Sequence, residues 1–141
     1  MKRYLFTVIA FLLTTALSAQ KDSTGFCAYL FNDEYQVFMR ISFHRQDIII
    51  PGQDILGPLS GFIGKEHYSF CWPIVAAEIK NNEAYLQLVN DYGSEDLEAV
   101  LVRENDSTYT FRQGKGSAVK MPDGGKWQKI PKILTFRKVD K

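Results

Sequence analysis

Residues 35–44, YQVFMRISFH, form the most regular stretch of the chain. Every second side chain is apolar, and most of those between are polar, with Phe38 as the exception. Side chains of a β-strand point alternately to its two faces, so this period of two predicts a strand with one face in a core. The apolar face holds Tyr35, Val37, Met39, Ile41 and Phe43.

Other segments have the same character and are separated by turn residues. Residues 74–80 and 83–89 flank Asn81-Asn82, and asparagine tolerates the positive φ that a two-residue hairpin needs. Strands are also expected at 26–31, 97–103, 108–112 and 133–139. We therefore predict an all-β fold, a single antiparallel β-barrel or sandwich of roughly eight to ten short strands.

Residues 94–105 admit a second interpretation. Ser94 could cap a helix whose first turn carries Glu95 and Asp96, the acidic side chains that a helix N-terminus favours. A strand is preferred because residues 96–99 alternate, and because the turn at 104–107 needs a partner for the strand that follows it.

Residues 1–19 are typical of a secretory signal peptide. Lys2 and Arg3 precede an apolar run at 5–13, and small residues follow up to Ala19. That run is too short to span a bilayer, which takes about 20 residues. We expect cleavage near Ala19, and residues 20–141 to form a single β-barrel domain that is exported to the periplasm or the cell exterior without a membrane span.

Cys27 and Cys71 are the only cysteines of the chain. Two cysteines in an oxidising compartment suggest one disulfide, so we predict a bridge between Cys27 and Cys71. The alternative is two buried thiols that never meet.

The stretch 91–98 is rich in acidic residues: Asp91, Glu95, Asp96 and Glu98. Their spacing does not match that of an EF-hand calcium loop. On a strand, Asp96 and Glu98 would share one face, while Asp91 and Glu95 would lie in the preceding turn. We therefore interpret the stretch as a solvated turn and strand face and expect no metal site.

No arrangement of residues predicts catalysis. His44 and His67 are the only histidines, and both are expected to be exposed or simply hydrogen-bonded. On a strand, His67 would lie about 13 Å from Cys71, too far for a base to activate a nucleophile. We expect no enzyme activity and no cofactor.

Charge is distributed unevenly along the chain. The formal net charge of +1 gives no reason to expect nucleic acid as a partner. Eight acids and two bases lie between 78 and 107, whereas nine bases and two acids lie between 112 and 141. The two segments could neutralise each other across strands, or form a dipolar surface that steers a charged partner. Lys126, Lys129 and Lys132, close to Trp127, form the patch to test.

The export signal, the succession of short strands and the many aromatic residues resemble those of small secreted lipocalin-like barrels. The resemblance covers residues 25–139 and implies a barrel, and a barrel of about eight strands can hold one small apolar ligand. The residues expected to line its interior are Tyr35, Met39, Ile41, Phe43, Phe62 and Trp72, with Phe70 as a further candidate.

Two functions remain open at this point, and residues 48–63, IIIPGQDILGPLSGFI, help to separate them. This apolar segment is broken by proline and glycine, which predicts a bent strand or an apolar loop over the barrel mouth. A cavity lined by aromatic side chains would favour a small-ligand binding protein. A filled interior with an exposed apolar patch near 56–63 would favour a protein-interaction module, such as an inhibitor or immunity-type protein acting through loops or a charged surface.

Overall fold

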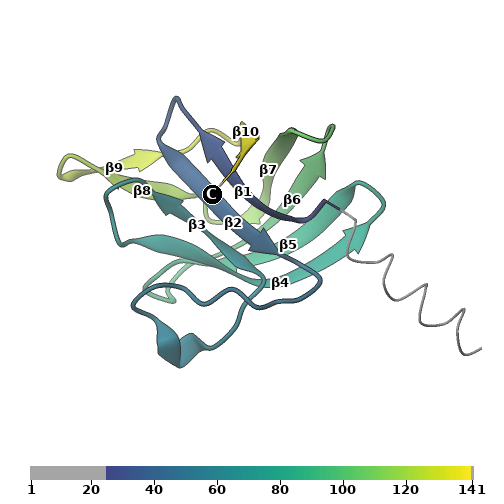
Figure 1. Ribbon diagram of the computed structural model, residues 1–141. Helices are drawn as coiled ribbons and strands as arrows, with labels where there is room; N and C mark the ends of the chain where they lie inside the picture. Colours follow the sequence, from purple (N-terminus) through teal and green to yellow (C-terminus); the bar gives the residue numbers. More distant parts are fainter. Residues whose placement is uncertain (1–24, 141) are drawn as a thin grey trace, which may run out of the picture.

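The computed structural model describes residues 25–140 and shows an all-β chain (Figure 1). Its elements are β1 (Cys27–Asn32), β2 (Val37–Ser42), η2 (Asp54–Leu56), β3 (Gly61–Lys65), β4 (Cys71–Lys80), β5 (Glu83–Val89), β6 (Asp96–Arg103), β7 (Thr108–Gly116), β8 (Lys120–Asp123), β9 (Lys126–Lys129) and β10 (Ile133–Val139). Between residues 25 and 140 no helix is long and apolar enough to cross a membrane. The signal peptide expected at 1–19 lies outside the described residues.

Eight of the strands close into an antiparallel barrel in the order β1-β10-β7-β6-β5-β4-β3-β2. From β1 to β7, each strand pairs with the next one along the chain. Strand β10 then completes the barrel by pairing with β7 on one side and with β1 on the other, where Tyr29 lies opposite Val139. The predicted all-β class and the barrel are confirmed, and β8 and β9 form a separate hairpin.

The turn chemistry of the sequence explains where the strands reverse. Asn81, between β4 and β5, has a φ of 60°, the left-handed conformation that asparagine tolerates. Residues 94–105 adopt the strand and not the helix, since Asp96–Arg103 is β6. Strand β6 pairs with both β5 and β7, and each neighbour supplies the hydrogen bonds that an isolated strand would lack.

The interior of the barrel is filled by side chains. Inward-facing residues from all eight strands form one apolar cluster, and Leu30, Met39, Ile74, Leu88 and Leu101 are fully buried within it. Such packing contributes most of the stability of a domain of this size, because each large apolar side chain taken out of water stabilises the fold by about 1.5–3 kcal/mol.

The β8–β9 hairpin covers one end of the barrel, which we call the hairpin end (left in Figure 1). Val119, Met121 and Ile130, in and beside the hairpin, belong to the core cluster. The indole Nε1 of Trp72, on β4, donates a hydrogen bond to the carbonyl of Lys120 at 3.2 Å. The hairpin is therefore part of the barrel's packing and closes this end of the interior.

Residues 44–60, between β2 and β3, run along the outside of the barrel. Ile48 and Ile50 form a second apolar cluster with Phe62 and Cys71, and an isolated antiparallel β-bridge joins Ile48 to Leu59. Residues 48–63 were expected to form a bent strand or a loop over the barrel mouth. Most of the segment is instead a loop that covers the barrel wall. Its apolar residues Ile48 and Ile50 pack on Phe62 of β3 and Cys71 of β4, which face outward from the barrel.

The predicted disulfide between Cys27 and Cys71 is wrong, since both cysteines are free. Cys27 begins β1 and is exposed, whereas Cys71 begins β4 and is buried. Strands β2 and β3 separate them, so the two positions are three strand spacings apart, roughly 14 Å. A disulfide requires Cα atoms within about 7 Å of each other.

Candidate functional site

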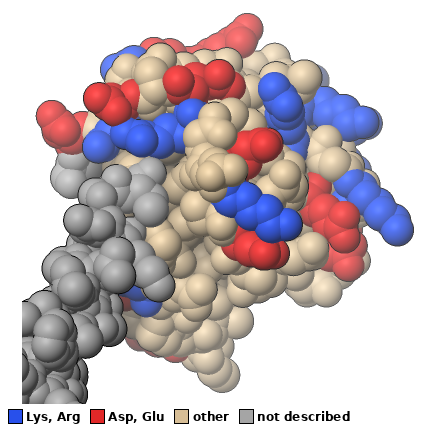
Figure 2. Space-filling model, turned by 90° about the vertical axis from the view of Figure 1, so that its right-hand side faces the viewer, with Lys and Arg blue, Asp and Glu red and all other residues tan. Residues whose placement is uncertain are grey.

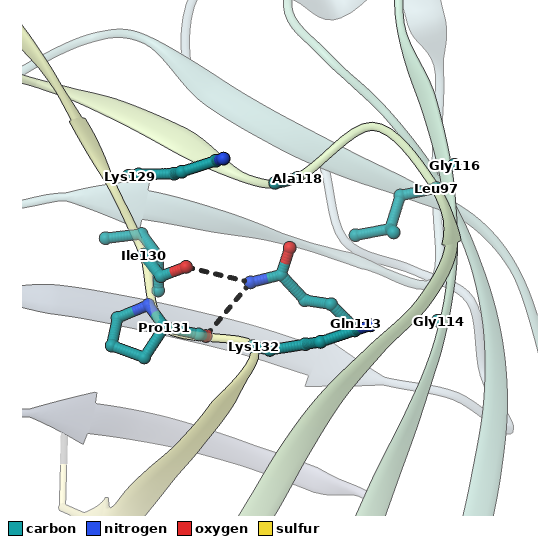
Figure 3. A pocket seen from close by; sticks show the side chains of 9 residues that line it. All are labelled: Leu97, Gln113, Gly114, Gly116, Ala118, Lys129, Ile130, Pro131 and Lys132. Carbon is teal, nitrogen blue, oxygen red and sulfur yellow. Dashed lines mark hydrogen bonds between the residues drawn. The ribbon is translucent and has the colours of Figure 1, made fainter.

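A pocket of about 460 Å³ lies at the hairpin end, between the last part of β7 and the segment that joins β9 to β10 (Figure 3). It is lined by Leu97, Gln113, Gly114, Gly116, Ala118, Lys129, Ile130, Pro131 and Lys132. We call it the lysine pocket. Its volume falls within the range of known small-molecule sites, about 300–1,000 Å³.

The pocket exists because β7 is longer than its pairing with β10. Ile133, the first residue of β10, lies opposite Arg112, so the end of β7 has a partner only on the β6 side. Two glycines in this part of β7 fit the close approach to β6. A Cβ at Gly116 would lie 2.5 Å from the carbonyl oxygen of Asp96, and one at Gly114 would lie 2.9 Å from that of Glu98. These glycines also leave the pocket wall without side chains.

Gln113 is the buried polar residue of the pocket lining, and its amide group is fully used within the protein. Its Nε2 donates to the carbonyls of Pro131 at 3.1 Å and Ile130 at 3.4 Å (Figure 3). Its Oε1 accepts a hydrogen bond from the backbone N–H of Val119 at 2.8 Å. Gln113 therefore fixes the walls of the pocket, and a ligand would depend on other groups for recognition.

Those other groups are apolar at the floor and cationic at the rim. Leu97 and Ile130 are buried, whereas Lys129 and Lys132 are exposed. The ion pairs within residues 25–140 are Lys65–Asp123, Lys80–Glu78, Arg103–Asp106 and Arg137–Asp33. Neither rim lysine takes part in them. The pocket thus combines an apolar floor with two ammonium groups that no described carboxylate neutralises.

The basic character extends over the hairpin. Lys129 on β9 lies directly opposite Lys120 on β8, and like charges in that position are unfavourable in a sheet. None of the four ion pairs in the described chain joins the acidic segment 78–107 to the basic segment 112–141. On the face in Figure 2, however, charges of both signs are interspersed over the upper part, and the lower part is mostly uncharged.

The residues expected to line the interior are placed in three different environments. Met39, Ile41, Phe43 and Trp72 are buried in the core cluster, and Tyr35 is half-buried against it. Phe62 lies in the outer cluster beneath residues 44–60. The lysine pocket uses none of them. Lys129 and Lys132 were singled out by the sequence, and Gln113 could have been found as the polar member of an otherwise inward apolar series at 109, 111 and 113.

The acidic and histidine residues do not converge. Within residues 25–140 no three or more His, Cys, Asp and Glu side chains gather where they could hold a metal ion. Asn90 organises the acidic turn, because its Oδ1 accepts hydrogen bonds from the N–H groups of Ser94 at 2.9 Å and Glu95 at 3.2 Å. His44 follows β2 and His67 lies in the β3–β4 turn, and both are exposed.

Cys71 has the properties of a structural thiol. Burial, together with the nearby carboxylate of Asp91, raises the pKa of the Cys71 thiol from 9.0 to about 12. A thiol attacks as the thiolate, so this environment makes Cys71 inert at neutral pH.

No protein-family model matches the sequence, and comparisons with curated proteins and with solved structures found no match either. The fold and the site therefore define the class of protein: a small closed antiparallel barrel of eight strands with a hairpin across one end. This is the architecture that the lipocalin-like resemblance implies.

Proposed function

We propose that this chain is an exported, non-enzymatic binding protein that holds a small apolar ligand with an acidic group in the lysine pocket. The observation that carries the proposal is the pairing of a buried apolar floor, Leu97 and Ile130, with the unneutralised rim lysines Lys129 and Lys132. An aliphatic or aromatic carboxylate would bury its apolar part against the floor and place its charge between the ammonium groups.

The location at the barrel end follows from packing. The interior side chains already fill the barrel, so a ligand there would have to displace them, whereas the lysine pocket has room of about 460 Å³. The site differs in this respect from the aromatic interior expected from the sequence.

A titration with decanoate, followed by calorimetry, tests the proposal. We expect saturable binding that Lys129→Gln and Lys132→Gln each weaken by about fivefold, because an exposed ion pair contributes up to about 1 kcal/mol. Lys126→Gln is the matched control, since Lys126 is an exposed lysine of the same hairpin outside the pocket lining. Absence of saturable binding, or an equal loss in the control, would contradict the proposal.

A second candidate function is supported by a different observation. Ile55 is 97 % exposed and Leu56 is 47 % exposed, and both belong to η2 in the segment that covers the barrel wall. Exposed large apolar side chains in one turn are typical of a surface that another protein covers. On this proposal the chain is a protein-interaction module, an inhibitor or immunity-type protein, that acts through this loop.

Native mass spectrometry of protein purified from its own host separates the two candidates. A retained small mass that is less abundant in Lys129→Gln supports ligand binding. A bound polypeptide that is lost in Ile55→Asp and kept in Lys129→Gln supports the interaction module.

A further inference from the structure

Three aromatic side chains lie together on the surface at the hairpin end. The ring of Phe70 contacts that of Tyr92, with centroids 5.4 Å apart, and that of Trp127, with centroids 4.9 Å apart. Tyr92 is 72 % exposed and Trp127 is 53 % exposed. Aromatic residues of this size are usually buried, so a contiguous exposed group of them marks a binding surface.

These rings surround a second pocket, of about 250 Å³, which we call the aromatic pocket. Buried Trp72 lies in its lining, and Asn90, Ser94, Glu95 and Lys120 supply its polar groups. It is formed by the β3–β4 turn, the start of β4, the β5–β6 turn and the hairpin. The two pockets have no lining residue in common. Lys120 lines the aromatic pocket, and Lys129, its partner across the hairpin, lines the lysine pocket.

The walls of the aromatic pocket are held in place by hydrogen bonds. The indole of Trp72 donates to the carbonyl of Lys120, and Asn90 binds the N–H groups of Ser94 and Glu95. The N–H of Gly124, at the tip of the hairpin, donates to the hydroxyl of Tyr68 at 2.8 Å. A site whose parts are fixed before binding loses less conformational entropy when a ligand enters.

The polar groups of the aromatic pocket are of both kinds. Glu95 offers a hydrogen-bond acceptor and Lys120 a donor, and with the other described residues neither side chain forms an ion pair or a hydrogen bond. Aromatic rings alone would favour a quaternary ammonium ion, but the ammonium of Lys120 repels a cation. An acidic ligand is disfavoured in turn by Glu95. With one acidic and one basic side chain, the lining has no net charge, which fits a neutral molecule that has an apolar face and several hydroxyl groups.

We propose that the aromatic pocket is a binding site for one ring of a neutral sugar. The C–H face of a pyranose would pack on the exposed rings of Tyr92 and Trp127, and its hydroxyl groups would donate to Glu95 and accept from Lys120. The site is independent of the ligand proposed for the lysine pocket.

Tryptophan fluorescence tests the proposal directly, because Trp72 and Trp127 are the only tryptophans of the chain and both line the pocket. The probes are the methyl glycosides of glucose, galactose, mannose and N-acetylglucosamine, with choline chloride as the competing class. We expect a saturable change with at least one glycoside. In that titration Tyr92→Ala and Glu95→Ala should each weaken the affinity by about fivefold or more.

Tyr85→Ala is the matched control, since Tyr85 is an exposed tyrosine on β5 that does not line the pocket. Circular dichroism of each variant verifies that the barrel is folded. No response to any of the four glycosides, saturation by choline instead, or an equal loss of affinity in Tyr85→Ala would each overturn the proposal. Lys129→Gln should leave sugar binding unchanged, so the outcome does not depend on whether the lysine pocket binds an acid.

Discussion

Gln113 connects the barrel to the segments that flank the hairpin, and replacing it with leucine tests how the hairpin end is held. The side chain is 6 % exposed and makes three hydrogen bonds, one from Val119 N–H and two to the carbonyls of Ile130 and Pro131. Leucine has a similar volume but no polar atoms. Gln113→Leu therefore leaves one backbone donor and two acceptors without their partner.

The expected loss follows from the burial of those three groups. A buried polar group left without a partner costs about 1–3 kcal/mol. The bond to Val119 N–H is buried and short, whereas that to Ile130 is long and that to Pro131 is only partly buried, so the first should dominate. The apolar leucine recovers part of the loss in the core. We expect the free energy of unfolding to fall by about 2–3 kcal/mol.

Urea unfolding followed by tryptophan fluorescence measures this change. Both tryptophans lie at the hairpin end, where Trp72 binds Lys120 and Trp127 belongs to β9. Gln87→Leu is the control, because Gln87 is an exposed glutamine of β5, and its replacement should alter stability by less than about 0.5 kcal/mol.

Hydrogen exchange adds a local test. The amide of Val119 should exchange faster in Gln113→Leu by a larger factor than the amide of Leu101, which lies in the middle of the barrel. If Gln113→Leu is as stable as Gln87→Leu, or if Val119 keeps its protection, then Gln113 does not hold the hairpin end and the reasoning is refuted.

Further predictions concern the two cysteines and two of the glycines. Thiol titration without reductant should find one reactive group, Cys27, in the folded protein and a second, Cys71, after denaturation; a single thiol or none in denaturant would contradict the free cysteines. The pKa of the Cys71 thiol is raised to about 12 in the folded protein, so on a rise in pH the thiol loses its proton in the unfolded chain first. The protonated Cys71 thiol therefore makes its full contribution to stability below pH 9.0, and this contribution is lost as the pH rises toward 12. Cys71→Val should flatten the decline seen in alkaline denaturation, and an unchanged slope would contradict this. Gly61→Ala should destabilise the protein by more than about 2 kcal/mol, because its Cβ would lie 2.1 Å from the carbonyl oxygen of Arg40. Gly93→Ala, at a positive φ with open space around it, should cost only about 1 kcal/mol, and urea unfolding of both variants measures the difference.

Most of the strands could be predicted because apolar residues on their inward face alternate with polar residues on their outward face. Residues 35–44 alternate, and the inward positions 37, 39, 41 and 43 are buried in the core cluster. Asn81-Asn82 identified the turn of the β4–β5 hairpin. Strand β5 has the predicted bounds, whereas β4 begins three residues earlier than predicted, at Cys71. The ambiguity over residues 94–105 was resolved by pairing, since β6 has a partner on each side.

The positions that depend on strand order could not be predicted. Phe62 and Ile63 are adjacent and both apolar, and one faces the core while the other faces the outer cluster. Alternation cannot distinguish the two faces where a loop covers the outside of the sheet. Cys27 and Cys71 look like a pair by composition, but two intervening strands keep them apart. The candidate pockets are missed for the same reason, since each joins side chains from turns and strands distant in sequence.

Barrel closure has a consequence for how the chain acquires its structure. Strand β1 finds one of its two partners only in β10, about 110 residues later, as in the pair Tyr29 and Val139. A nascent chain therefore keeps the edge of β1 unpaired until residues 133–139 are available, and an unpaired edge invites aggregation. The successive hairpins from β4 to β7 can form early because their contacts are local, whereas the closing step joins the most distant segments and is the slow one.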